Sequence, residues 1–191
     1  MYRMVKCTED TTSYNMNKQD IVENLRLLDK KLRENNMYGE VDLYGGAVMC
    51  LGLNARESTH DIDALFAPKT NIRLLIQEVA DENGLPDDWM NDGVKGFVSS
   101  KGKVIPLELG NFTNLSICMA SPEYLFAMKC LSCRMQIDNS TEIDDIRFLI
   151  NYLDIQSVEA AEDIILQYYP AKMFKPKTHF MLLELFDDPV K

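Results

Sequence analysis

Two aspartates separated by one residue, Asp61 and Asp63, are the side chains of this sequence best placed to do chemistry. They open a predicted strand over residues 62–66, and alternate side chains on a strand point to one face, so the two carboxylates share a face. At a separation of about 4 Å and an effective dielectric near 20 they repel by roughly 4 kcal/mol, so a proton, a basic partner or a divalent cation must offset them. Mg²⁺ often binds one or two carboxylates together with substrate phosphates. The alternative is a solvated strand end, because a single D-x-D motif is common.

A glycine pair lies upstream of these carboxylates. Gly45-Gly46 ends a predicted strand over 41–44 and begins a short helix over 47–51. Glycine lets the backbone approach a phosphate closely, and a helix N-terminus offers free N–H groups. Arg56, Ser58 and Thr59, in the loop that follows, add side chains for the same phosphates. A metal on one side and amides on the other favour phosphoryl or nucleotidyl transfer. The competing interpretation is an unrelated α/β protein in which the aspartates are structural.

Hydrophobic periodicity predicts the elements that position these residues. A helix begins at Asn17, its N-cap, and repeats apolar residues at helical spacing after a loose lead-in over residues 1–16. A further helix runs from Asn71 to Asn83 and is followed by a long polar connection over 85–101, in which Trp89 anchors one helical turn. Two further strands are predicted over 104–109 and 115–119.

The character of the chain changes after Ser121-Pro122, an N-cap with proline at the first helical position. Four helices are predicted from there, over 123–134, 142–153, 157–168 and 177–187. We therefore expect an α/β (α+β) fold with a core over residues 1–120 and a C-terminal helical region over 121–191 packed on it.

The stretch 41–66 resembles the signature of the DNA-polymerase-β-like nucleotidyltransferase superfamily, in which a Gly-Gly or Gly-Ser turn and a short helix precede D-x-D. The run from Arg56 to Asp63 is similar to small bacterial members, including the toxins of AbiE-type abortive-infection systems. The resemblance implies a mixed sheet flanked by helices, followed by a helical bundle. It also implies Mg²⁺ as cofactor and a nucleoside triphosphate as substrate.

The resemblance further implies a third carboxylate on a later strand, which completes the metal site and can act as general base. Glu108 is the best match, because Ile105, Leu107 and Leu109 form the apolar face of its predicted strand and Glu108 points the other way. Asp61, Asp63 and Glu108 are thus the predicted catalytic and metal-binding set. A solvated strand glutamate is the alternative for Glu108, and Asp88 and Asp92 are weaker matches within a loop.

Residues 121–134 and 143–150 resemble the same small bacterial members. A lysine and an aspartate are functional there, and Lys129 and Asp145 match them, with Arg134 nearby. A lysine among apolar neighbours could meet a triphosphate as a point charge. The alternatives are a lysine at the edge of the core and a structural Lys129–Asp145 pair.

Composition and charge limit the partners and the cellular location that fit this chain. The chain has 191 residues and a net charge of −10, which disfavours binding to duplex DNA because phosphate contacts need Lys and Arg. No stretch approaches the roughly 20 apolar residues of a membrane span, and the N-terminus lacks a signal peptide, so we expect the cytoplasm. The five cysteines are interpreted as reduced thiols, including the C-x-x-C of Cys130 and Cys133. His60 and the lysines Lys172, Lys175 and Lys177 are interpreted as exposed side chains.

These observations predict a Mg²⁺-dependent nucleotidyltransferase. It moves a nucleotidyl group to a hydroxyl of RNA, protein or a small molecule. A toxin with a cognate protein partner in a toxin–antitoxin system is one biological form of such an enzyme, and an antitoxin or another regulator is a second. The alternative is a binding or interaction module that keeps the fold while its catalytic site has decayed.

Overall fold

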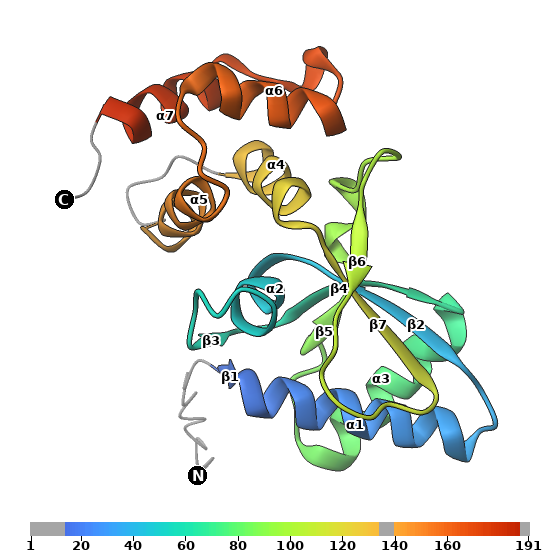
Figure 1. Cartoon of the computed structure of the whole chain (residues 1–191). Helices are drawn as coiled ribbons and strands as arrows, with labels where there is room; N and C mark the ends of the chain where they lie inside the picture. Colours follow the sequence, from blue (N-terminus) through green and yellow to red (C-terminus); the bar gives the residue numbers. More distant parts are fainter. Residues whose placement is uncertain (1–13, 134–139, 188–191) are drawn as a thin grey trace, which may run out of the picture.

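The computed structural model describes residues 14–133 and 140–187, and it is built around a mixed five-stranded sheet (Figure 1). The strand order is β5 (Met90–Asn91), β4 (Ile62–Ala67), β2 (Gly39–Leu43), β7 (Leu115–Ala120) and β6 (Val104–Pro106). The pairs β2–β4 and β6–β7 are antiparallel, whereas β2–β7 and β4–β5 are parallel. The predicted class, a mixed sheet flanked by helices, is confirmed.

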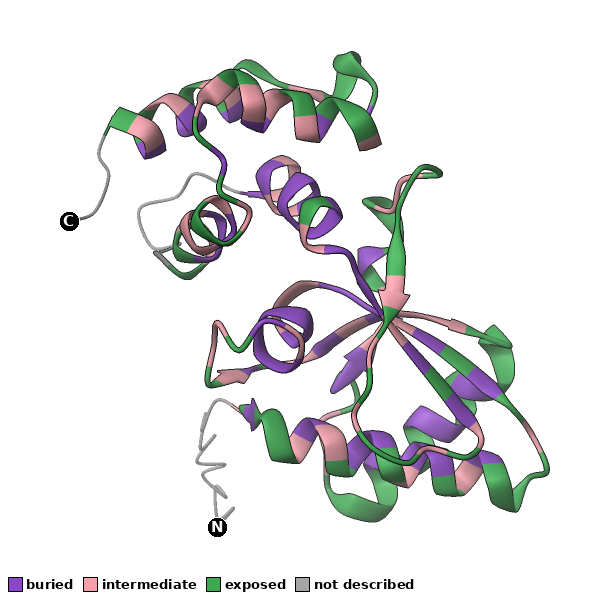
Figure 2. Ribbon diagram, in the orientation of Figure 1, coloured by how far each residue is buried: buried purple, intermediate pink, exposed green. Residues whose placement is uncertain are grey.

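One face of the sheet is covered by α1 (Lys18–Glu34) and α3 (Lys69–Asn83), whose inner sides are buried in Figure 2. The predicted N-cap of α1 is confirmed, since the Asn17 side chain accepts hydrogen bonds from the backbone of Gln19 and Asp20. A side-chain cap of this kind stabilises a helix by about 1 kcal/mol. The apolar residues at helical spacing in α1 are fully buried: Ile21, Leu25, Leu28 and Leu32.

The helix α2 (Gly45–Leu51) packs against β4 and α1, beside a small two-stranded sheet. That sheet pairs β1 (Met16–Asn17) with β3 (Ser58–Thr59). The loop containing Ser58 and Thr59 is therefore tied to the start of α1, and the buried Met16 was wrongly assigned to a loose lead-in. Residues 1–13 of that lead-in, with Cys7, lie outside the described residues.

The connection over 85–101 holds two short elements, β5 and the 3-10 helix η1 (Gly93–Gly96). β5 was not predicted, and the expected helical turn is present as η1, a few residues after Trp89. Trp89 anchors the segment as expected, because its ring is fully buried and its Nε1 donates a hydrogen bond to the Ile76 carbonyl over 3.2 Å. The segment therefore returns to the sheet beside β4.

The four predicted C-terminal helices are present as α4 (Pro122–Ser132), α5 (Ser140–Tyr152), α6 (Val158–Tyr168) and α7 (Pro176–Asp187), with the 3-10 turn η2 (Ala171–Met173) before α7. Ser121 caps α4 by accepting from the Tyr124 backbone, as predicted. β7 ends at Ala120, directly before this cap. None of the helices in the described ranges is both long and apolar enough to cross a bilayer.

The helical region contacts the α/β part of the chain through Tyr124. Its ring lies 6.3 Å from that of Tyr44 in an edge-to-face arrangement, and its hydroxyl accepts a hydrogen bond from the Ser99 backbone over 2.7 Å. Cys130 and Cys133 are free buried thiols, and burial raises the pKa of each. Arg134, which the sequence placed near Lys129, lies outside the described residues.

Candidate functional site

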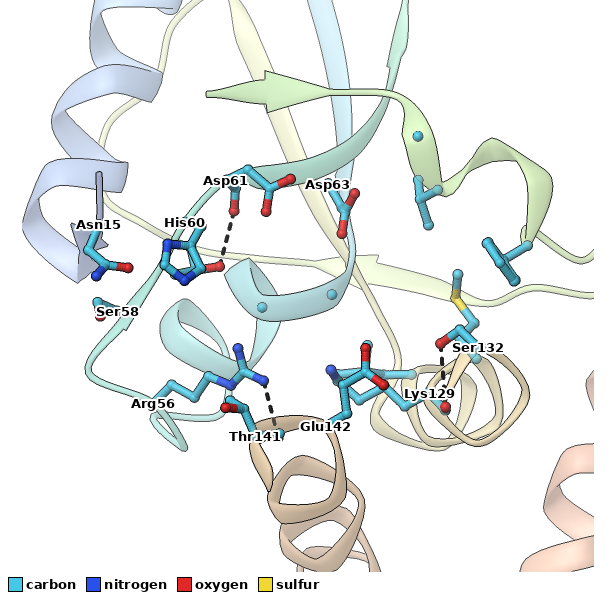
Figure 3. Close-up of a pocket in the computed structure, with 18 of the residues that line it drawn as sticks. Asn15, Arg56, Ser58, His60, Asp61, Asp63, Lys129, Ser132, Thr141 and Glu142 are labelled. Atoms are coloured by element: carbon cyan, nitrogen blue, oxygen red, sulfur yellow. Dashed lines mark hydrogen bonds between the residues drawn. The ribbon is translucent and has the colours of Figure 1, made fainter. Parts of the chain in front are cut away.

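A cleft of about 860 Å³ lies between the start of β4 and the helices α4 and α5 (Figure 3). Residues far apart in the sequence meet there, because β4, the loop before it, η1 and both helices each supply a wall. Most of the side chains and glycines predicted from the sequence line it: Gly45, Gly46, Arg56, Ser58, Thr59, Asp61, Asp63 and Lys129.

The two carboxylates of Asp61 and Asp63 point into the cleft side by side (Figure 3). The strand around them is fixed, since the Tyr44 backbone N–H donates to the Asp63 carbonyl over 2.9 Å. Asn91 on β5 orients Asp61, because its Nδ2 donates to the Asp61 Oδ2 over 2.7 Å while its Oδ1 accepts from the Gly93 backbone over 2.8 Å. The second bond sets the direction of the amide, so its donor faces the carboxylate.

The charge of this pair is incompletely offset. The pKa of Asp63 is raised from 3.8 to about 6, first by burial and then by the Asp61 carboxylate, while the Lys129 ammonium acts in the opposite direction. Burial and a like charge both disfavour the ionised form. The pair is therefore a place where a cation would be favourable.

The glycine pair is required by how closely the chain packs behind the carboxylates. Gly45 has φ +57°, which is strained for other residues, and a Cβ there would lie 2.6 Å from the Asp63 Oδ2. A Cβ on Gly46 would overlap the Thr59 hydroxyl and come within 3.3 Å of the Arg56 guanidinium. The two glycines thus bring the start of α2 against Asp63 and Arg56.

A second charged cluster forms the opposite wall. Asp145 on α5 has a side chain only 4% exposed, and its carboxylate accepts from the Arg56 Nε over 2.6 Å and pairs with the Lys129 Nζ over 2.5 Å. Arg56 also donates to the Thr141 carbonyl over 3.3 Å. Arg56 and Lys129 line the cleft, whereas Asp145 lies behind them. The prediction that Asp145 contacts a nucleotide directly is therefore corrected: its carboxylate holds the two cations in place. The Lys129–Asp145 pair considered from the sequence is present.

Glu108 is not near the carboxylate pair, and the predicted three-carboxylate set is wrong on this point. β6 ends at Pro106, and Glu108 beyond it is exposed. Val104 on β6 pairs with Ala120 on β7. The registers of β7 with β2 and of β2 with β4 then place Val104 level with Asp63. Glu108 is four residues further, about 13 Å along the strand, and β6 is three strand spacings of about 4.8 Å from β4. The prediction that Glu108 points away from the apolar side of its strand was correct, but neither the strand register nor the strand order could be predicted from this segment.

Asp88 and Asp92, the weaker candidates for the third carboxylate, also lie away from Asp61 and Asp63. Asp92 forms ion pairs with Lys69 and Arg73, each over 2.8 Å, and its pKa is lowered, most by the bond to Lys69. Asp88 is exposed. Over residues 14–133 and 140–187, no three His, Cys, Asp or Glu side chains gather into a group able to hold a metal ion. A metal at Asp61 and Asp63 would thus need further oxygen ligands, which substrate phosphates can supply.

Several residues in or beside the cleft were missed by the sequence analysis. Asn91, which bonds to the cleft-lining Asp61, belongs to a strand of two residues, too short for a periodic signal. On α4, however, Leu125, Met128 and Ser132 share the helical face of Lys129 at spacings of three and four, a signal that was available. His60 lines the cleft as well, and its Nδ1 lies 3.1 Å from the Tyr14 carbonyl.

No family model, curated protein or solved structure matches this chain.

Proposed function

We propose that this protein is a Mg²⁺-dependent nucleotidyltransferase that takes a nucleoside triphosphate into the cleft. The observation that carries the proposal is the arrangement of charge. Asp61 and Asp63 are held together with their repulsion incompletely offset, and they face Arg56 and Lys129 across a cleft of about 860 Å³. A cation together with a polyphosphate would complement both walls at once.

The donor set at the carboxylates fits Mg²⁺. Asp61 and Asp63 offer the hard oxygen ligands that this ion prefers, and phosphate oxygens would complete its coordination. When bound, the ion would polarise phosphoryl oxygens and neutralise their developing charge.

The cations on the opposite wall would bind the phosphates. Lys129 has three N–H donors, and its bond to Asp145 leaves donors for a ligand. Arg56 is held through its Nε and one terminal nitrogen, while its other terminal nitrogen lies beside the glycine turn. Because Asp145 fixes both side chains before a ligand arrives, little reorganisation is needed at the moment of reaction.

The proposed reaction is an in-line substitution. The oxygen of an acceptor hydroxyl forms a bond to the α-phosphorus, the bond from that phosphorus to the bridging oxygen breaks, and pyrophosphate leaves while the hydroxyl proton passes to solvent. The acceptor belongs to RNA, a protein or a small molecule. A role in a cytoplasmic toxin–antitoxin pair is the biological form that we propose.

A specific observation favours a second candidate, a binding module whose catalytic site has decayed. Glu108 lies away from the cleft, and a neutral amide, Asn91, stands beside Asp61. Such a module would bind the triphosphate and transfer nothing.

Thermal unfolding with Mg²⁺ and each of the four ribonucleoside triphosphates tests the binding site. Ligand at about 100 times its dissociation constant should stabilise the folded state by roughly 2.7 kcal/mol. We expect the stabilisation to require Mg²⁺, to disappear in Asp61→Asn/Asp63→Asn, and to persist in Asp88→Asn, an exposed control outside the cleft. If no triphosphate stabilises the well-folded protein, the proposal is wrong.

Transfer is then tested with triphosphates labelled at the α-phosphate and with RNA or protein as acceptors. Label that becomes acid-precipitable with the wild type but not with the double variant supports the enzyme. Binding without transfer to any of these acceptors favours the decayed module.

A further inference from the structure

One end of the cleft is apolar. Val94 and Phe97 come from η1 and the residue after it, and Leu125 and Met128 come from α4. Three of these side chains are buried, whereas Phe97 remains 43% exposed. A partly exposed aromatic side chain thus lines the cleft together with three buried apolar ones.

The backbone around Phe97 is held in place. Its N–H donates to the Val94 carbonyl over 2.8 Å, and its carbonyl accepts from the Tyr169 hydroxyl over 2.6 Å. The Tyr169 ring lies 6.3 Å from that of Tyr124, which precedes the cleft-lining face of α4. Because these bonds use the backbone of Phe97, its side chain can be changed without removing them.

The same segment is tied to the carboxylate pair at its other end. Asn91 bonds both to Asp61 and to the N–H of Gly93, the first residue of η1. Phe97, the residue after η1, therefore lies on the segment that Asn91 joins to Asp61.

The cleft therefore has two chemical ends. Asp61, Asp63 and the cations Arg56 and Lys129 occupy one part, and the apolar group with Phe97 occupies the other. A ligand that matches both carries phosphates at one end and a flat ring at the other. We propose that the apolar end, defined by Val94, Phe97, Leu125 and Met128, is the nucleobase subsite, in which the base stacks on Phe97. This inference rests on the proposed function for the phosphate end.

The competing explanation is an isolated exposed phenylalanine, a common surface feature without a role. The two differ in what Phe97 contributes to binding. A stacking ring strengthens the binding of a nucleotide but not of the same phosphate chain without a base. An isolated surface ring strengthens neither.

The test compares ATP with inorganic tripolyphosphate, each with Mg²⁺, by isothermal titration. We expect Phe97→Ala to weaken ATP binding about tenfold or more, the range of base–aromatic stacking, and to leave tripolyphosphate binding unchanged. Phe97→Leu should also weaken ATP binding, since it keeps apolar volume and removes the aromatic face. Phe97→Tyr, which keeps an aromatic ring, should bind ATP as the wild type does. Phe180→Ala, an exposed aromatic on α7, is the matched control and should change neither ligand.

The outcomes separate the two proposals. If the wild type binds both ligands and the folded Phe97 variants bind ATP as well as it does, the base subsite is wrong and the phosphate site stands. If Phe97→Leu weakens both ligands equally, the subsite is also wrong. If the wild type binds neither ligand, the proposed function fails and the subsite fails with it.

Discussion

The two walls of the cleft carry carboxylates in opposite situations. Asp145 is buried, and two cations are bonded to it. Asp63 is half-buried beside another aspartate, and Lys129 offsets its charge only from a distance. The first carboxylate joins parts of the fold, because Arg56 precedes β3, Lys129 is on α4 and Asp145 is on α5.

The difference separates a cluster whose charges are satisfied within the fold from one whose charges are not. A displacement of the Asp63 pKa from 3.8 to about 6 corresponds to about 3 kcal/mol of unfavourable free energy in the ionised protein. Folding alone gives no reason to retain that cost. The Asp145 cluster has no comparable deficit, since its charge is bonded on both carboxylate oxygens.

The largest expected change in the free energy of unfolding comes from removing the Asp145 carboxylate from its pairs with Arg56 and Lys129. Asp145→Asn should lower the free energy of unfolding by about 3–5 kcal/mol, because it leaves Arg56 and Lys129 without their anion in a partly buried place. Urea unfolding measures this. Asp144→Asn, an exposed neighbour on the same helix, should change stability by no more than about 0.5 kcal/mol. An equal effect of the two variants would show that the cluster does not hold the helices to the sheet.

At the Asp61–Asp63 pair, loss of a carboxylate should change the free energy of unfolding in the opposite direction. Asp63→Asn removes a carboxyl whose pKa is raised on folding, so it should stabilise the ligand-free protein by about 3 kcal/mol above pH 7. In the wild type the penalty is full above the folded pKa of about 6 and absent below the unfolded value near 3.8. The advantage of the variant should therefore fade as pH falls from 7 to 4, as measured by unfolding both proteins at each pH. A constant or negative difference would contradict the charge arrangement.

The smallest effect is expected at Glu108. Glu108→Gln should change stability by no more than about 0.5 kcal/mol, because the side chain is exposed. It should also leave Mg²⁺-dependent stabilisation by triphosphates unchanged in thermal unfolding. A loss of that stabilisation, as large as in the double variant Asp61→Asn/Asp63→Asn, would restore Glu108 to the site and overturn the register argument.

The parts of the fold that depend on local patterns were predictable. The Asn17 cap, the helical spacing of α1 and the Ser121-Pro122 start of α4 are encoded within a few residues and appear as expected. The face shared by Asp61 and Asp63 likewise follows from strand alternation alone. Local periodicity was thus sufficient for these elements.

The remainder depends on pairing between distant segments. The position of Glu108 is set by the register of β6 on β7 and by the strand order, which no local pattern specifies. The bond from Asn91 to Asp61 joins residues 30 apart through a strand of two residues. The burial of Asp145 likewise depends on how α5 docks.

The bond between Arg56 and Asp145 spans 89 positions of the chain, and this has a consequence for biosynthesis. Translation makes the N-terminal part first, at about 5–20 residues per second. Asp61 and Asp63 can therefore fold into their strand several seconds before Lys129 and Asp145 leave the ribosome. During that interval the growing polypeptide has Asp61 and Asp63 without Lys129, and Arg56 without its partner Asp145, so the charges of the cleft reach their final arrangement only after α4 and α5 have been synthesised.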